Sequence, residues 1–336
     1  MVRNVGVGSL PGTDIVEALK VVIDEHTDFM YLPELPNRGP GADMIGRTGA
    51  LLAGVASDLA IETTPTGWKF ADAPGMHVRR ALSWLNEDLD RLEERVGDAD
   101  VRLKVQLTGP VTLAATIELQ RGERAIVDPG AVRDLALAHR EAVIAHVSDV
   151  RRRLPGATIT VQIDEPAMTA AVRGQLPRQS GFGKLRSLEA SVVADIHAGI
   201  ATAISEVGAT PWLHSCAPTW PLELATKAGY RGISGNFSLL TDTDEEALGT
   251  AIEHDITIVA GVIPTTDSEL GGQPASEVAT VTPIRLRFQR LGLQQHLAGV
   301  VLTPTCGLGN VRWKSALVAI ARLHAAARLL EEDFDG

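Results

Sequence analysis

The stretch Ala-Thr-Ile-Thr-Val-Gln-Ile-Asp-Glu-Pro, residues 157–166, joins a largely apolar run to two adjacent carboxylates and a proline. The run Ala157–Ile163 is rich in β-branched residues and short, which predicts a buried strand. Asp164 and Glu165 follow it directly, and Pro166 favours a turn. The same order, a strand that ends in unusual polar residues, recurs along the chain and decides the fold that we predict.

Eight runs of this kind alternate with longer helical patterns. They are Val5–Leu10, Phe29–Leu32, Val101–Leu107, Ala157–Ile163, Pro211–Leu213, Gly232–Phe237, Ile256–Val262 and Gly299–Leu302. Strands that alternate with helices predict parallel pairing through crossover connections. Eight such units predict an α/β fold, a single (β/α)8 TIM barrel that covers residues 1–336. A doubly wound open sheet is the alternative.

The positions of the polar residues favour the barrel over the open sheet. Most of the unusual ones come just after a predicted strand: Ser9, Glu34, Thr108, Asp164, Glu165, His214, Cys216 and Cys306. A closed barrel brings the carboxyl ends of all its strands to one face, where barrel enzymes hold their active sites. An open sheet would spread the same residues along a line.

Net charge, apolar runs and cysteine count argue against several classes of protein. The formal net charge is −11, whereas nucleic-acid binding needs a basic face. No run of 18 apolar residues predicts a membrane span, and the start Met1–Gly6 has no signal-peptide pattern. The two cysteines cannot form a disulfide framework. A single bridge is possible, but a reduced, cytoplasmic compartment is the simpler interpretation.

Three residues at two predicted strand ends have the chemistry of zinc ligands. His214 and Cys216 follow the fifth run, and Cys306 follows the eighth. Residues two apart on a strand point to the same side, so His214 and Cys216 can share one target. Imidazole and thiolate both suit zinc. The alternative is structural, with two small buried cysteines and a satisfied core histidine.

The carboxylates at strand ends also allow two interpretations. Asp164 and Glu165 could hold an amine or share a proton, or they could stabilise the start of a helix by capping it. Glu34, in the segment Pro33–Pro36, is a carboxylate on a restricted backbone at the end of the second run. It could equally be a solvated loop charge.

Taken together, six short motifs in this order resemble the C-terminal catalytic domain of cobalamin-independent methionine synthase. They are Gly8–Pro11, Pro33-Glu34 with Asp43-Met44, Leu107–Thr112, Gln162–Ala167, His214–Cys216 and Cys306–Leu308. The resemblance covers almost the whole chain. The superfamily also contains uroporphyrinogen decarboxylases and corrinoid-dependent methyltransferases, all built as barrels.

This resemblance implies a zinc-dependent methyltransferase that acts on the thiol of homocysteine or a related small thiol. It implies that His214, Cys216 and Cys306 bind the zinc. It further implies that Glu34 and Asp164 bind the substrate amino group and that Ser9 contacts its carboxylate. The implied methyl donor is methyltetrahydrofolate or a methyl-corrinoid protein, which would then be a partner.

The sequence departs from the family pattern in three places. The fourth zinc ligand of the family is a glutamate near the position of Asn236–Ser238, where this chain has none. The stretch Leu113–Ile117 lacks the tryptophan that stacks on the pterin of folate. The full-length enzyme carries an additional N-terminal barrel that this sequence does not show.

Two rival functions remain open at this point. One is a degenerate barrel that binds an amino acid or a partner without turnover. The other is a uroporphyrinogen-decarboxylase-like enzyme, which would need arginines at the strand ends. The sequence offers few of them there, since Arg38 and Arg47 are expected in the loop after the second strand.

Overall fold

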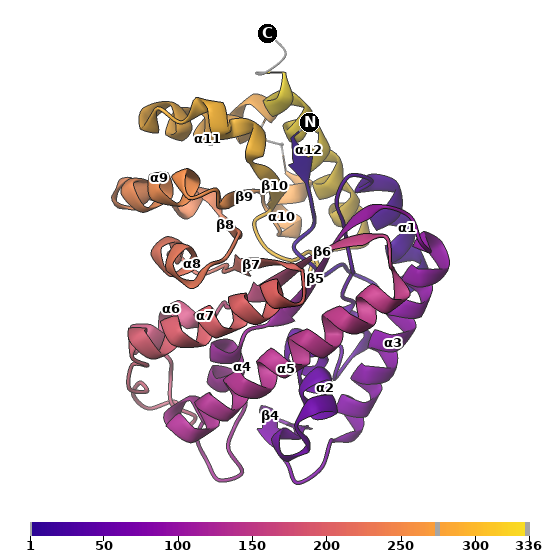
Figure 1. The fold of residues 1–336 in the computed structure, drawn as a ribbon, viewed down its shortest axis with the longest axis vertical. Coiled ribbons are helices and arrows are strands. Elements are labelled where there is room, and N and C mark those ends of the chain that lie inside the picture. The colour runs from indigo at the N-terminus through magenta and orange to yellow at the C-terminus, as the bar shows by residue number, and fades with distance from the viewer. Residues whose placement is uncertain (1, 273–275, 333–336) are drawn as a thin grey trace.

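A computed structural model describes residues 2–272 and 276–332. Its main sheet has eight parallel strands in the order β1-β10-β9-β8-β7-β6-β5-β2, and the sheet curls on itself (Figure 1). The strands are β1 Arg3–Asn4, β2 Met30–Tyr31, β5 Val101–Thr108, β6 Ala157–Asp164, β7 Thr210–His214, β8 Gly232–Asn236, β9 Thr257–Ile263 and β10 Val301–Pro304. The prediction of eight parallel strands in a TIM-like α/β fold is confirmed.

The two edge strands of the sheet meet at a single point. Within the described residues no ladder joins β1 to β2, so the predicted closed barrel is confirmed only as a curled sheet. An isolated parallel bridge links Ser9 to Glu34. The Glu34 amide donates to the Gly8 carbonyl over 3.1 Å, and the Leu10 amide donates to the Glu34 carbonyl over 2.9 Å. The edges therefore touch where two predicted site residues lie.

The first predicted strand, Val5–Leu10, was placed too late. The ladder with β10 runs through Arg3 and Asn4. The segment that follows has Gly6, where an added Cβ would lie 2.3 Å from the Tyr31 ring. The buried ring of the second strand thus occupies the space beside the first, and only a glycine allows this close approach.

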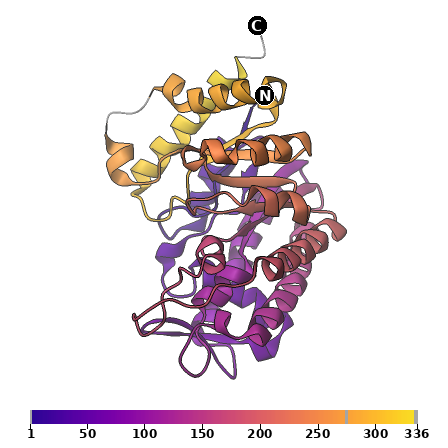
Figure 2. The ribbon, with the colours of Figure 1, turned by 90° about the vertical axis from the view of Figure 1, so that its left-hand side faces the viewer.

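Helices cover the outside of the curled sheet (Figures 1 and 2). They are α1 Ile15–Glu25, α2 Met44–Val55, α3 Met76–Val96, α4 Pro110–Thr116, α5 Pro129–Arg153, α6 Met168–Val172, α7 Ala190–Glu206, α8 Leu222–Ala228, α9 Glu245–Glu253, α10 Asp267–Gly271, α11 Glu277–Leu291 and α12 Trp313–Glu331. Single-turn 3-10 helices include η1 Pro36–Arg38. None of the described helices is long and apolar enough to cross a membrane.

Local sequence explains several helix starts. Asp43 caps α2 by accepting hydrogen bonds from the amides of Ile45 and Gly46, each over 3.0 Å. Asp128 caps α5 in the same way, and Pro129 occupies its first turn. A hairpin of β3 Ile61–Thr64 and β4 Gly67–Phe70 lies beside α2.

The interior of the sheet contains a buried polar layer below the strand ends. The Lys104 ammonium on β5 donates to the Val7 carbonyl over 2.6 Å and to the Gln106 side chain over 3.2 Å. Gln162 on β6 donates to the same Val7 carbonyl over 2.9 Å. These bonds connect the segment after β1 to β5 and β6, so the layer holds the site from below.

Candidate metal and substrate site

The three predicted zinc ligands come together at one end of the sheet. His214 is the last residue of β7, whereas Cys216 and Cys306 lie two residues beyond β7 and β10. The His214 Nε2 atom is 2.9 Å from the Cys216 sulfur, and the two sulfurs are 2.9 Å apart. Both cysteines are free thiols. Cys216 is thus in the loop rather than on the strand as expected, but it still faces the same target as His214.

Ser234 on β8 orients His214 and was missed by the sequence analysis. Its hydroxyl is 2.9 Å from the Nδ1 atom of the ring, and both side chains are buried. This contact leaves Nε2 to face the sulfurs, as in metal sites where a hydrogen bond to one ring nitrogen orients the other. A hydroxyl residue inside the sixth apolar run was the signal that could have identified it.

The electrostatics of the thiols suit a cation. The hydrogen bond from Cys216 lowers the pKa of Cys306 to about 4, aided by His214 and opposed by burial. The pKa of Cys216 is raised, first by its bond to Cys306 and then by burial. One negative charge is therefore stabilised on the sulfur pair, 2.9 Å from the His214 Nε2 atom at its closest.

The donor set fits zinc. The imidazole nitrogen and two sulfurs lie within 4.8 Å of one another, and among the described residues this is the one such group of three or more His, Cys, Asp or Glu side chains. Two cysteines and one histidine with an open fourth position are a known catalytic zinc set. Asn236, at the position of the missing glutamate, accepts hydrogen bonds from the Ser238 amide and hydroxyl in its own turn.

Asp164 lies next to this group. It ends β6 and pairs in register with Thr108 on one side and His214 on the other. Gln162 donates to its carboxylate over 2.8 Å. Asp164 as a residue is partly exposed, and desolvation raises the pKa of its carboxyl group to about 7, despite the opposing effects of His214 and Lys104.

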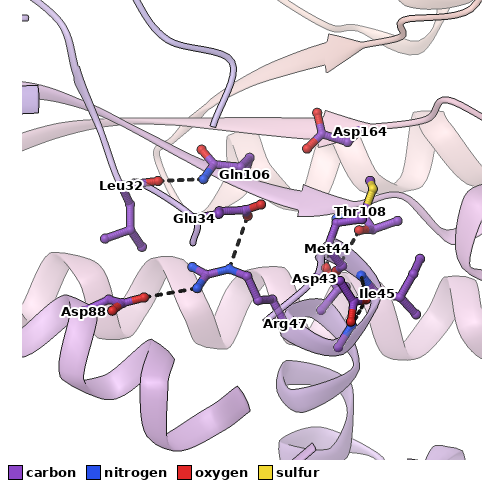
Figure 3. Close-up of polar contacts among 12 residues, drawn as sticks. Leu32, Glu34, Asp43, Met44, Ile45, Arg47, Asp88, Gln106, Thr108 and Asp164 are labelled. Atoms are coloured by element: carbon purple, nitrogen blue, oxygen red, sulfur yellow. Dashed lines mark hydrogen bonds and ion pairs between the residues drawn. The ribbon is translucent and has the colours of Figure 1, made fainter. Parts of the chain in front are cut away.

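Glu34 is buried and paired with Arg47 (Figure 3). The Arg47 Nε atom is 3.3 Å from a carboxylate oxygen of Glu34, and the same guanidinium donates to Asp88 over 3.1 Å. Glu34 is therefore not the solvated loop charge that was the alternative. Arg47 lies in α2 and not in the expected loop, because the cap at Asp43 starts the helix early.

Ser9 holds the turn that follows Cys306. Its hydroxyl oxygen accepts a hydrogen bond from the Gly309 amide over 3.1 Å, and its carbonyl accepts one from the Leu308 amide over 2.9 Å. A Cβ on Gly307 would lie 2.2 Å from the Ser9 hydroxyl oxygen, so a glycine is needed there. Ser9 thus links Glu34, through the bridge between them, to the second cysteine.

Glu165 points away from its neighbour Asp164. Its fully buried carboxylate accepts hydrogen bonds from the Val111 amide over 3.0 Å and from the Thr112 amide and hydroxyl over 2.7 and 2.6 Å. The buried His197 ring lies 3.4 Å away. Glu165 does stabilise the start of a helix, as one of its two interpretations proposed. The helix is α4, which precedes Glu165 in the sequence, and not the helix that follows it. The two carboxylates do not form a shared-proton pair.

A cavity of about 430 Å³ lies beyond the ends of β8 and β9. Its wall includes Asn236, Gly261 and Thr305, the residue before Cys306. A larger cavity of about 610 Å³ lies between α5 and α7 on the outer layer, where none of the predicted site residues lines it. None of the predicted site residues lines the smaller cavity either, but it reaches the turn before Cys306 through Thr305.

Comparison with known proteins agrees with this arrangement. A family model described as "Cobalamin-independent synthase, Catalytic domain" matches residues 2–329. The B12-independent methionine synthase from Shewanella sp. W3-18-1 in complex with selenomethionine has a TM-score of 0.63 at 11% identity, over 99% of this chain and 98% of that chain. A Xaa-Pro dipeptidase with bound methionine has a TM-score of 0.29 at 14% identity, over 75% and 69%, too low to carry an argument. No curated protein sequence matches.

The structural match at 11% identity establishes the fold alone, whereas the family model covers nearly the whole chain. The family model describes a cobalamin-independent enzyme, which argues against the corrinoid protein that was expected as a possible donor and partner. The chain belongs to the cobalamin-independent synthase family and contains its catalytic domain.

Proposed function

We propose that this protein transfers a methyl group to the thiol of homocysteine or a closely related amino-acid thiol, and that residues 1–336 form one catalytic domain. The observation that carries the proposal is the convergence at one end of the sheet. A sulfur and imidazole group, His214, Cys216 and Cys306, lies beside the two carboxylates of Asp164 and Glu34.

In this proposal His214, Cys216 and Cys306 hold a zinc ion. When bound, zinc would supply a Lewis acid that lowers the pKa of a substrate thiol into the neutral range. Ser234 keeps the imidazole in the orientation that presents Nε2. Ser9 keeps Cys306 in place through the turn at Leu308 and Gly309.

The substrate amino group would bind between Asp164 and Glu34. With a pKa near 7, Asp164 is close to its midpoint at neutral pH, so a nearby ammonium favours its ionised form. The Ser9 oxygen already accepts from Gly309, and among the described residues its own hydroxyl hydrogen is given to no acceptor. That hydrogen is free to donate to the substrate carboxylate.

The cavity of about 430 Å³ beside Thr305 is the place that we assign to the methyl donor. Because the family is cobalamin-independent, methyltetrahydrofolate is the donor to test first. The missing tryptophan in Leu113–Ile117 means that any pterin would have to bind without that stacking contact.

Metal content and methyl transfer test the proposal in sequence. The purified protein should contain about one zinc per chain, and Cys306→Ser should lose it, as measured by mass spectrometry. The zinc-loaded protein should then convert homocysteine to methionine with a methyl donor. A wild-type protein that takes up no zinc would refute the catalytic reading. Zinc and amino-acid binding without transfer from any donor would instead indicate a binding protein.

A further inference from the structure

Asp88 on α3 is a fully buried carboxylate held between two arginines. One of its oxygens accepts from Arg38 over 2.7 Å, and the other accepts from Arg47 over 3.1 Å. Figure 3 shows the Arg47 side chain extended between Asp88 on one side and Glu34 on the other. Glu34, Arg47, Asp88 and Arg38 thus form a chain of four alternating charges.

The contact between Arg47 and Glu34 differs from the other links. The Nε atom is 3.3 Å from the Glu34 oxygen, but it is buried and makes no aligned hydrogen bond among the described residues. The bond to Asp88 fixes the guanidinium, and the guanidinium then faces Glu34 as an ion pair. One donor thus stays unsatisfied beside a carboxylate of the proposed substrate site.

The other end of the chain holds the loops that surround this site. Arg38 lies in η1, after β2, and its Nε atom donates to the Thr13 carbonyl in the loop after β1 over 3.1 Å. Its guanidinium also lies 5.9 Å from the centre of the Trp84 ring on α3. Asp88 therefore connects α3 both to the loops after the first two strands and to Glu34.

A buried chain of charges needs a reason besides stability. Taking charges out of water costs free energy, and well-packed apolar residues often replace a buried ion pair without loss. This chain ends on a residue at the strand end, beside Ser9 and on the same face as Asp164. The cost is explained if the chain determines where the Glu34 carboxylate lies.

We propose that Arg47, locked by Asp88, is a positioning residue that holds Glu34 in the orientation that receives the substrate ammonium. The inference rests on the proposed function for the identity of the ligand. It predicts that a lysine cannot replace Arg47, since a point charge on a flexible stem cannot contact Asp88 and Glu34 in the way that a planar fork does.

The first test is structural and needs no ligand. Crystal structures of wild type, Arg47→Lys and Arg47→Met should show the Glu34 carboxylate in its original place only in the wild type. A Glu34 side chain that keeps its position in Arg47→Met would overturn the inference. If Arg47→Met does not fold, Arg47→Lys and Asp88→Asn provide the same comparison.

The second test is a double-mutant cycle on L-homocysteine affinity, measured by calorimetry with the zinc-loaded protein. Arg47→Met should raise the Kd about tenfold or more, the value of one charge-assisted hydrogen bond, and should add little in a Glu34→Gln background. Arg153→Met is the matched control. Arg153, on α5, pairs with Asp90, which is on the same helix as Asp88 but does not contact the site. This variant should leave the Kd unchanged.

The two tests separate the possible failures. An equal effect of Arg47→Met with and without Glu34 would mean that Arg47 does not act through Glu34, and this overturns the inference. A wild-type protein that binds no homocysteine would refute the proposed function, while the crystal structures would still decide whether Arg47 positions Glu34.

Discussion

The two halves of the site are built in different ways. On the side of β7, β8 and β10, the side chains of His214, Cys216 and Cys306 contact one another directly, with Ser234 behind them. On the side of β2 and β6, the acidic side chains of Glu34 and Asp164 have cationic neighbours from elsewhere in the chain. Arg47 faces Glu34, and Lys104 lies below both carboxylates, where burial lowers its pKa to about 8.

The two halves differ in how far apart their partners lie in the sequence. We call His214, Cys216 and Cys306 the metal half, and Glu34 and Asp164 the carboxylate half. A His-x-Cys pair makes two ligands from three consecutive residues, so only one long-range approach, that of Cys306, completes the group. Each carboxylate needs partners from other elements, because an unpaired buried charge is costly. The metal half should therefore respond to mutation through metal affinity, and the carboxylate half through substrate affinity and stability.

The largest effect is expected from loss of a metal ligand. Cys216→Ser should lower zinc affinity by more than about a hundredfold, the upper range for residues that only orient a ligand. Zinc titration with a competing chelator measures this. Amino-acid binding by the carboxylate half should survive, and a joint loss of both would show that the two halves are not separable.

The adjacent carboxylates should respond in opposite ways. Glu165→Gln should lower the free energy of unfolding by about 3 kcal/mol, because it leaves buried donors without their charged partner. Asp164→Asn should cost nothing at pH 8 or should stabilise, while amino-acid binding is lost. Its folded pKa of about 7 lies above the unfolded value of 3.8, so its charge reduces stability progressively as pH rises through that range.

Urea unfolding at pH 8 measures both variants. Asp164→Asn with a large loss of stability would place Asp164 among the structural residues. Glu165→Gln with wild-type stability would mean that its bonds to Val111 and Thr112 contribute little.

A smaller effect on zinc affinity is expected from Ser234, which contacts His214. Ser234→Ala should weaken zinc binding roughly tenfold to a hundredfold, because the imidazole loses the contact that orients it. The exposed Ser238→Ala is the matched control on the same segment and should bind zinc as wild type does. Equal zinc affinities for Ser234→Ala and wild type would remove Ser234 from the site.

A last effect is confined to acid pH and concerns a buried histidine near Arg47. Burial, with help from Arg47, lowers the pKa of His146 to about 4. The folded state therefore binds fewer protons than the unfolded state, and stability that is full above pH 6.5 is lost as pH falls toward 4. The loss is about 1.4 kcal/mol per pH unit. His146→Leu should flatten the pH dependence of urea unfolding in this window, and an unchanged slope would contradict it.

The strands β5 and β6 were predicted successfully from the sequence. Apolar, β-branched composition located both strands to within one residue, because each run ends in clear turn signals. Short strands were less certain, and the first was predicted too far along the chain, since its ladder with β10 runs through Arg3 and Asn4. The helices α6 and α10 have five residues each, too few to show a period.

The sequence by itself determined the alternating α/β order, the parallel strands, and the set of polar residues at the strand ends. It could do so because periodicity and turn chemistry are local properties of the chain. It also identified His214, Cys216 and Cys306 as a candidate group, although their approach to one another is a property of the folded sheet.

Only the tertiary structure decided the roles of neighbours that look alike in the sequence. Asp164 faces the site and Glu165 caps α4, since successive residues at a strand end point to opposite sides. Arg47 and Asp88 are 41 residues apart, and neither carries a local signal of its partner. Long-range charge pairs depend on which surfaces the fold buries together, and this information exists only when the chain is folded.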